Sequence, residues 1–265
     1  MTTKEFSSEF DILYDNASKG APGLDLYEKS VFLTQAQEEI VKEAYSGYSR
    51  TGVSFEGSER RRRQLSELVK DYWTTTEAPS EQEETSTLDS NNVSRKSDTN
   101  TPNYVDMNIV DGSVFYFLPT EVMYLVFERV TLNDNRIINV TPVTHDEFNQ
   151  SIKNPFRKPS RNIAWRLDVQ APGAYMKVEI IANQAVKKYH IRYVKKPNAI
   201  VLSNFESDDE LAGLGLTVDG DNIERSSELN NEMHRDILSR AVEIAVLVSR
   251  ENTLQNKVKL NRNIV

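Results

Sequence analysis

The sequence contains no cysteine, and this absence excludes several functions at once. A disulfide framework, a catalytic thiolate and a cysteine-bound metal ion all need the missing side chain. No apolar run approaches the roughly 18 residues that a membrane-spanning helix requires. The first residues, MTTKEFSSEFD, also lack the apolar core of a secretory signal. We therefore expect a soluble protein of a reducing or redox-indifferent compartment, with no membrane partner.

Positive charge is also in short supply. The chain carries 32 Lys and Arg against 40 Asp and Glu, a formal net charge of −8. Because nucleic-acid affinity depends on clustered cations, bulk binding of DNA or RNA is not expected. The 265 residues correspond to about two domains, or to one domain with large excursions, and 38% hydrophobic residues suffice for a core.

The charge is distributed unevenly along the chain. Residues 1–73 carry a net charge of −3, residues 74–103 of −4, residues 104–203 of +4 and residues 204–265 of −5. A cationic middle between anionic ends is compatible with attraction between neighbouring copies of the chain. Simple scatter in surface composition explains the pattern equally well.

The N-terminal part, residues 1–73, is expected to be helical. Its first apolar residues, Phe6, Phe10, Leu13 and Ala17, share one face of a helix. The sequence GAPG at residues 20–23 then breaks the chain.

Three further polar residues or pairs mark helix starts in this part. Asp25 with Glu28 predicts a capping box, and Thr34 with Gln37 predicts that the helix restarts or bends before it stops near Gly47. A third helix is expected to begin after Ser58, with an apolar side formed by Leu65, Leu68, Val69 and Tyr72.

Residues 74–103 form a polar extended arm or linker. Among its non-proline residues, only Ala78, Leu88 and Val93 are apolar. Such a segment cannot bury enough surface to offset its ordering entropy, so alone it is expected to be disordered. To be ordered it needs an external surface, and another subunit is the most economical candidate.

From about residue 104 to residue 203 the pattern changes from helical spacing to alternation, which predicts an antiparallel β domain. The expected strands cover residues 105–109, 114–117, 122–131, 136–143, 162–169, 174–182 and 187–195. Tight turns are expected at Asp111-Gly112, at residues 133–135, at residues 171–173 and at residues 183–184, and Thr144 with Glu147 predicts a short helix. Strands joined by tight turns favour an antiparallel sheet or barrel over a β-α-β arrangement.

The C-terminal part is expected to contain an acidic loop or arm at residues 204–226, a helix at residues 227–251 and a polar tail at residues 252–265. The helix has one apolar face, made by Met233, Ile237, Ala241, Ile244, Ala245 and Val248. This face is expected to pack on the N-terminal helices. The predicted fold class is therefore α+β: a helical layer from both chain ends around an inserted antiparallel β domain, with long extended arms.

No residue pattern predicts catalysis. The three histidines, His145, His190 and His234, are far apart in sequence and lack metal-ligand spacing. Phosphate-binding glycine loops and nucleophile elbows are missing, and the paired carboxylates at residues 38–39, 208–210 and 219–221 are typical of solvated charge. We expect no enzyme activity, no cofactor and no metal.

One charge run is conspicuous, formed by Arg60, Arg61, Arg62 and Arg63. Four consecutive helical residues point in all directions, so they cannot all follow one phosphate track. Three interpretations remain: ion pairs to an acidic neighbouring subunit, contact with a phosphate, or a solvated helix start. Together with Lys257, Lys259 and Arg262 of the tail, these arginines are the candidate partner-interface residues.

Three blocks of the sequence together match the pattern of one known family. The first block runs from Ala21-Pro22-Gly23-Leu24 into Tyr27-Glu28-Lys29-Ser30-Val31-Phe32-Leu33-Thr34-Gln35-Ala36-Gln37. The second block is Tyr193-Val194-Lys195-Lys196-Pro197, followed by Ile200-Val201-Leu202. The third is Glu232-Met233-His234-Arg235-Asp236-Ile237-Leu238 with Ala241-Val242-Glu243-Ile244-Ala245.

With these three blocks the chain resembles virion neck proteins of crAss-like bacteriophages. The resemblance implies a virion structural protein, a ring-forming adaptor subunit of the head-to-tail connector. Its expected partners are further copies of itself in a homododecamer, the portal protein, and adjacent tail or ring proteins. The ring would surround the channel through which the genome is ejected, with DNA passing the acidic lumen without sequence-specific binding. The implied location is the neck of the virion, assembled in the cytoplasm of the bacterial host.

Two other functions stay open at this point. A tail-associated receptor- or glycan-binding module would place aromatic side chains of the β domain on sugars, with Tyr104, Tyr116, Tyr124, Tyr175, Tyr189 and Tyr193 as candidates. A small hydrolase is the third alternative, and the motif search disfavours it.

Overall fold

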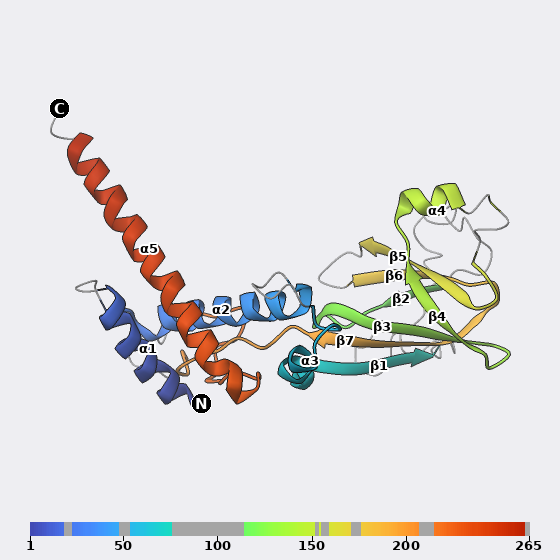
Figure 1. The fold of residues 1–265 in the computed structure, drawn as a ribbon, viewed down its shortest axis with the longest axis horizontal. Helices are drawn as coiled ribbons and strands as arrows, with labels where there is room; N and C mark the ends of the chain where they lie inside the picture. Colours follow the sequence, from blue (N-terminus) through green and yellow to red (C-terminus); the bar gives the residue numbers. More distant parts are fainter. Residues whose placement is uncertain are drawn as a thin grey trace. The chain divides into compact units, whose positions relative to one another are not determined.

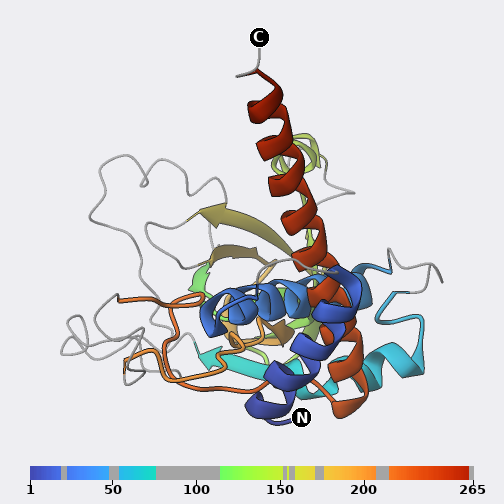
Figure 2. The ribbon, with the colours of Figure 1, turned by 90° about the vertical axis from the view of Figure 1, so that its left-hand side faces the viewer.

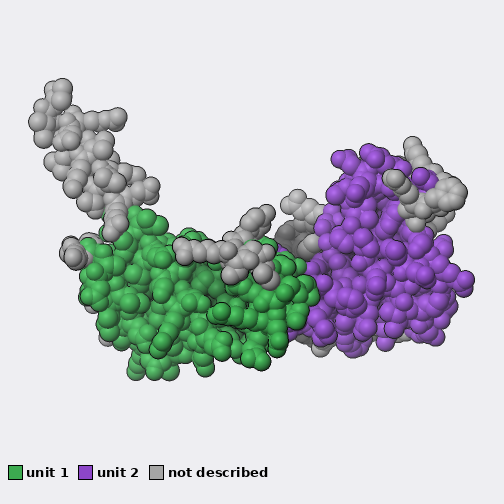
Figure 3. All heavy atoms as spheres, in the orientation of Figure 1, with its two compact units in different colours: residues 1–68, 196–265 green, residues 69–195 purple. Residues whose placement is uncertain are grey.

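The computed structural model describes residues 1–18, 23–47, 54–75, 114–151, 154, 159–170, 176–206 and 215–262. The chain divides into two compact units (Figure 3). Unit 1 consists of Met1–Leu68 and Lys196–Val265, and unit 2 consists of Val69–Lys195. Both ends of the sequence thus belong to unit 1, and unit 2 is inserted between them. Helices and strands are both present, which confirms the expected α+β class.

Unit 1 is built from helices (Figure 1). They are α1 (Thr3–Ser18), α2 (Leu26–Ser46), the short α3 (Glu59–Leu65) with a following 3-10 turn (Ser66–Leu68), and α5 (His234–Arg262) after a 3-10 turn (Asn231–Met233). Both α1 and α2 pack against α5, as Figure 2 also shows. The Phe6 ring lies 5.2 Å from that of His234, and Arg240 Nε bonds Glu39 Oε2 at 2.7 Å.

The two ends of α2 follow the expected local rules. Asp25 Oδ1 accepts a hydrogen bond from the Glu28 N–H at 2.7 Å, and Glu28 Oε2 accepts one from the Asp25 N–H at 3.2 Å. This reciprocal pair is the predicted capping box. The helix stops at Gly47, whose φ of 75° lies in the left-handed region that favours glycine.

Other helix boundaries differ from the prediction. The second helix does not restart at Thr34 but runs without a break from Leu26 to Ser46, and the side chains of Thr34 and Gln37 bond a distant segment instead of a helix end. Ser58 makes no side-chain capping hydrogen bond. The third helix is also shorter than expected, since Val69 and Tyr72 belong to strand β1 (Val69–Thr75), which pairs with β7 over its whole length.

The last helix begins and ends later than the predicted range of residues 227–251. It starts at His234, after the 3-10 turn of Asn231–Met233. It continues to Arg262, so residues 252–262 of the expected polar tail are helical. Its buried face is also rotated slightly: Leu238, Val242 and Val246 are buried, whereas Val248 is 41% exposed. Each of these three additional buried residues directly follows Ile237, Ala241 or Ala245 in the sequence. The apolar stripe of α5, which packs against α1 and α2, is therefore wider than predicted.

One non-helical segment of unit 1 is held in place by hydrogen bonds from side chains of α2. Residues 198–202 lie along three polar side chains of α2 spaced by one helical turn. Ser30 Oγ accepts from the Leu202 N–H at 3.1 Å, Thr34 Oγ1 accepts from the Ile200 N–H at 3.0 Å, and Gln37 Nε2 donates to the Asn198 carbonyl at 2.8 Å. Ser227 Oγ then donates to Gln37 Oε1 at 2.6 Å. All three helix side chains are buried, so α2 supplies the hydrogen bonds that a neighbouring strand would otherwise provide.

The described residues of unit 2 form one seven-stranded sheet and one short helix. Its strands are β1 (Val69–Thr75), β2 (Val114–Phe117), β3 (Val122–Leu132), β4 (Ile137–Pro142), β5 (Ile163–Gln170), β6 (Met176–Ile181) and β7 (Val186–Lys195), in the spatial order β1-β7-β3-β4-β5-β6-β2. The prediction of a purely antiparallel sheet is wrong at one place. Strands β4 and β5 pair in parallel, and the helix α4 (His145–Ser151) lies in the crossover between them, which makes a β-α-β unit.

The sheet curls around its core. Tyr116 of β2 and Tyr189 of β7 lie far apart in the strand order, yet their ring centroids are 5.0 Å apart. Both rings are fully buried in a cluster that includes Val130, Ile180 and Ile191. On the other face, α4 covers only the β5–β6 part, where Phe148 packs on Trp165, Leu167 and Ile181. On the rest of that face, Trp73 of β1, Phe127 of β3 and Ile137 of β4 are exposed.

Several predicted elements lie outside the described residues. These are residues 76–103 of the polar arm, the strand at residues 105–109 with its Asp111-Gly112 turn, the turn at residues 171–173 and residues 207–214 of the acidic loop.

Candidate interface surfaces

The outer face of the sheet carries a regular array of cationic and aromatic side chains. Strand register places Trp73, His190 and Arg129 in one row across β1, β7 and β3, because paired residues point to the same side. Asp71, Arg192 and Phe127 form the next row, and Lys188 with Thr131 and Ile137 the row on the other side. We call the set Asp71, Trp73, Phe127, Arg129, Lys188, His190 and Arg192 the cationic sheet face.

This face is exposed because the sheet buries its other side. Along β7, Tyr189, Ile191 and Tyr193 point into the core, so the alternating residues Lys188, His190 and Arg192 point outward. Two large apolar side chains remain open on it: Trp73 is 59% exposed and Phe127 40%. Exposed aromatic groups next to cations are typical of protein–protein contact surfaces.

The cations of the face are held in place by its own groups. Arg192 bonds Asp71 through two nitrogens, at 3.0 and 3.2 Å, and this interaction is the main reason why the pKa of Asp71 lies below its usual value. Arg129 lies over the Phe127 ring at 5.9 Å, and Lys188 over the Trp73 ring at 5.3 Å. Three permanent cations face one carboxylate, so the face has a surplus of positive charge.

His190 stands in the middle of this array, paired with Trp73 on one side and Arg129 on the other. Partial burial is the largest cause of its lowered pKa, and the positive charge of Arg129 adds to it. Its Nε2 lies 3.4 Å from Asp71 Oδ1, an interaction that acts in the opposite direction. Protonation at lower pH would therefore add a further charge to an already cationic surface.

Unit 1 presents the opposite sign. On α1, the side chains of Phe6, Phe10 and Tyr14 are buried, which turns Glu5, Glu9, Ile12, Asp15 and Asn16 toward solvent. We call these five residues the acidic helix face. Ile12 lies at its centre and is 60% exposed.

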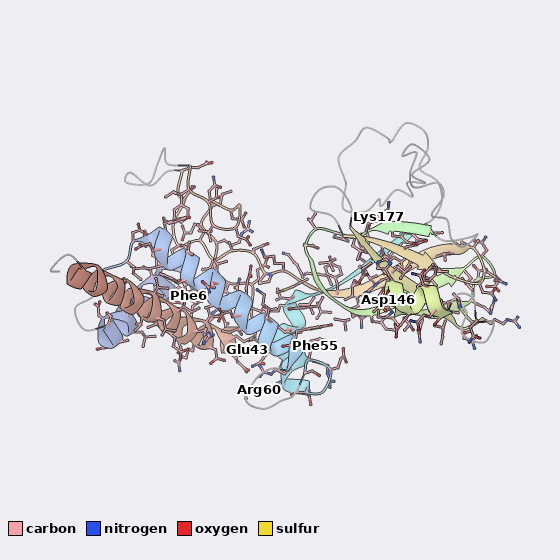
Figure 4. The ribbon with its side chains drawn as sticks, turned by 90° about the horizontal axis from the view of Figure 1, so that it is seen from above. Phe6, Glu43, Phe55, Arg60, Asp146 and Lys177 are labelled. Atoms are coloured by element: carbon pink, nitrogen blue, oxygen red, sulfur yellow. The ribbon has the colours of Figure 1, made fainter. Side chains whose placement is uncertain are left out.

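The arginines predicted as interface residues lie on α3, and Figure 4 labels Arg60 there. Arg60, Arg62 and Arg63 are exposed, and Arg61 is half-buried. Arg62 Nη1 donates to the Glu56 carbonyl at 2.7 Å, which fixes one member of the run to its own chain. The other predicted cations, Lys257, Lys259 and Arg262, lie in the last turns of α5, and their side chains are outside the described residues.

A buried ion-pair network occupies the inner side of the sheet. Arg166 Nη1 donates to Glu128 Oε1, Arg166 Nε lies 2.8 Å from Asp168 Oδ1, and Tyr189 Oη donates to Glu128 Oε2 at 2.6 Å. Burial raises the pKa of Glu128 despite its cationic partner, and burial also raises that of Tyr189. Each of these side chains has a partner within the network, which links β3, β5 and β7 through their polar groups.

The tyrosines proposed for sugar stacking are mostly core residues. Tyr116, Tyr189 and Tyr193 are buried, so the expectation that their rings can stack on a glycan is wrong. Tyr124 is half-buried, and Tyr104 and Tyr175 lie outside the described residues.

The histidines and carboxylates form no metal site within the described part of the chain. His145 Nε2 lies 3.1 Å from the Asp168 carbonyl on the surface, and His234 Nε2 lies 2.9 Å from the Leu229 carbonyl inside unit 1. Among the described helices, none is long and apolar enough to cross a membrane.

Sequence reasoning named the arginine run and missed the cationic sheet face. The available signal was the alternation in residues 186–195, which places three basic residues on one side of a strand and three apolar or aromatic residues on the other. Trp73 was missed as a surface residue of the sheet because its segment was expected to be helical, whereas it belongs to strand β1.

Comparison with known proteins identifies the family. The family model described as phage tail ring protein 3/4 matches residues 1–257. Ring protein 3 of Bacteroides phage crAss001 is 34% identical over 257 residues, which cover 93% of this chain and 96% of that protein. Ring protein 4/5 of the same phage is 31% identical over 268 aligned positions, which cover 99% of both chains. The chain belongs to the phage tail ring protein 3/4 family and is a ring structural protein of a crAss-like phage.

Proposed function

We propose that the protein is a subunit of a closed homo-oligomeric ring in the head-to-tail connector of the virion. The ring joins the portal to the tail and surrounds the channel through which DNA leaves the capsid. Its neighbours along the axis are the portal protein and other ring proteins, and assembly takes place in the host cytoplasm. A homododecamer is the copy number that we expect.

One combined observation supports the proposal. The chain belongs to a family of ring proteins, and its two units expose faces of opposite charge. A head-to-tail ring needs two different and complementary surfaces on each copy, because each copy contacts its two neighbours differently. The cationic sheet face and the acidic helix face supply such a pair. The net charge of −8 suits a channel along which DNA moves without adhering to the wall.

The arginines of α3 and the cations at the end of α5 are assigned to contacts with partner proteins. Guanidinium groups pair with carboxylates in a planar, two-bonded geometry, so the exposed Arg60, Arg62 and Arg63 suit an acidic neighbour in the stack. No observation favours glycan binding, since the buried tyrosines of unit 2 are not accessible to a sugar.

A density map of the intact virion tests the proposal. The expected result is a closed ring of this chain on the tail axis, between the portal and the tail, with DNA or an open channel at its centre. Location of the chain at a fibre tip, or as isolated single copies, would contradict it. Native mass spectrometry of the purified chain complements the map and gives the copy number where the ring forms alone.

A further inference from the structure

The two charged faces also match in shape and apolar content. From Asp71 to the end of β1 at Thr75 the sheet face extends about 13 Å along the strand, at about 3.3 Å per residue. From Glu5 to Asp15 the helix face extends about 15 Å, at 1.5 Å per residue. Three strands at about 4.8 Å spacing make a platform about 10 Å wide, which is the diameter of one helix.

Each face combines exposed apolar side chains with charges that are mainly of one sign. Ile12 projects between Glu9 and Asp15, at i−3 and i+3, and is 60% exposed. On the sheet, the exposed rings of Trp73 and Phe127 stand beside Lys188 and Arg129. Neither Glu9 nor Asp15 has a hydrogen bond or ion pair to another described residue, so both carboxylates are available to a partner.

We propose that the acidic helix face of one copy docks on the cationic sheet face of the next copy, with Ile12 of α1 against the rings of Phe127 and Trp73. Glu5, Glu9 and Asp15 then meet Arg129, Lys188 and Arg192. This contact deepens the proposed function, because it names the surfaces that make the ring head-to-tail. The occupant is a second copy of this chain, chosen by charge complementarity and by the heterologous contacts that a ring requires.

The footprint of one helix on three strands is smaller than the ~800 Å² that each partner contributes to a standard stable interface. A single contact of this kind is therefore weak, and ring closure supplies the additional stability. The rim charges set the orientation and the salt dependence of the contact more than its strength.

Disulfide trapping tests the contact directly, because the chain has no cysteine of its own. Mixing the full-length single variants Ile12→Cys and Phe127→Cys, or Ile12→Cys and Trp73→Cys, is expected to give a cross-linked dimer under mild oxidation. Ile12→Cys alone is expected not to cross-link to itself, since the two neighbours meet through different faces. The matched control uses Ile223→Cys in place of Ile12→Cys, because Ile223 is also 60% exposed. This control is expected to give no cross-linked dimer.

The double variant Ile12→Cys/Phe127→Cys separates the alternatives. In virions assembled with this variant supplied in trans, a ladder of covalent multimers is expected, because each copy has one face of each kind. A cross-link within single chains only would mean that the two faces meet inside one molecule, and the proposal would be wrong. It would also be wrong if Ile12→Cys linked only to itself, or if no variant pair reacted in virions.

Charge reversal provides an independent readout. Glu9→Lys and Lys188→Glu are each expected to weaken self-association at low salt about fivefold, and the double reversal is expected to recover most of that loss. Glu43→Lys makes the same charge change at an exposed position of α2, off the acidic helix face, and is expected to change little. An equal loss in Glu43→Lys would show that only net charge matters and would overturn the proposal.

The outcomes distinguish this contact from the proposed function. A ring in the virion map without the cross-link between residues 12 and 127 or 73 leaves the connector role intact and removes the contact. If the chain forms no ring in virions, both the connector role and the proposed contact are refuted. Duplex DNA could also be found to inhibit self-association of the wild-type chain but not of Lys188→Glu. That result would identify the sheet face as a nucleic-acid surface and would also overturn the proposed contact.

Discussion

The hydrogen bonds between α2 and residues 198–202 make a prediction that can be tested on the isolated chain. Thr34→Val keeps the size and branching of the side chain and removes its hydroxyl. The Ile200 N–H then loses its acceptor at 3.0 Å, and the Ile200 carbonyl loses its donor at 3.3 Å. Thr34→Ser is the matched control, because it keeps the hydroxyl and loses only the methyl group.

The expected cost follows from burial. Thr34 is 7% exposed and Ile200 is fully buried, so water cannot replace the lost partner. A buried donor without an acceptor costs about 1–3 kcal/mol, whereas loss of a single methyl group costs about 1 kcal/mol. We expect Thr34→Val to lower the free energy of unfolding of unit 1 by about 2 kcal/mol. Gln37→Met is expected to cost at least as much, since the Asn198 carbonyl and Ser227 hydroxyl both lose a partner.

The chain provides separate optical probes for its two units. Both tryptophans, Trp73 and Trp165, belong to strands of unit 2, while most of the helix belongs to unit 1. Urea unfolding of Thr34→Val followed by circular dichroism at the helix band is expected to shift to lower denaturant. A greater loss in Thr34→Ser than in Thr34→Val would refute the reasoning, because packing of the methyl group would then outweigh the hydrogen bonds.

Three further predictions concern stability. Glu128→Ala is expected to lower the free energy of unfolding of unit 2 by about 3 kcal/mol, because the buried Arg166 keeps only the half-exposed Asp168 as a carboxylate partner and the buried Tyr189 hydroxyl loses its acceptor. Glu128→Gln is expected to cost less, and tryptophan fluorescence during urea unfolding measures both variants. Gly47→Ala is expected to cost about 1 kcal/mol, since Gly47 has a φ of 75°, with Gly47→Asn costing less in the same helix-band measurement. Burial lowers the pKa of His234 from 6.5, so the unfolded state binds the proton more readily; stability is expected to decrease as pH falls below about 6.5, and a flat pH profile in the wild-type chain would contradict this.

Local rules predicted the elements whose ends are fixed by their own residues. The capping box at Asp25 and Glu28 and the left-handed glycine at position 47 are formed within one or two turns of chain, and both are present. The strands of residues 114–117 and 122–131 were also predictable, because alternation is a property of the segment itself.

The misassigned elements are those decided by distant partners. Leu65, Leu68, Val69 and Tyr72 have helical spacing, yet Val69 and Tyr72 pair with Val194 and Ile191 of β7, more than a hundred residues away. The parallel pairing of β4 with β5 likewise depends on the crossover through α4, which the strand pattern does not encode. Thr34 and Gln37 fitted the spacing of a capping box, and only the position of residues 198–202 shows that their hydrogen bonds go elsewhere.

The same dependence on partners explains why the candidate site was the hardest feature to predict. The cationic sheet face exists only when β1, β7 and β3 are neighbours, since its residues come from three strands that lie far apart in the sequence. Its charge is modest and its apolar area is small, so a single contact through this face is weak. A closed ring has one more contact than the open chain of the same number of copies, and that last contact forms without further loss of free subunits. In the ring that we propose, every copy repeats the contact, so a fivefold change at one contact multiplies around the ring. Glu9→Lys is therefore expected to reduce the yield of complete rings far more than the association of two copies.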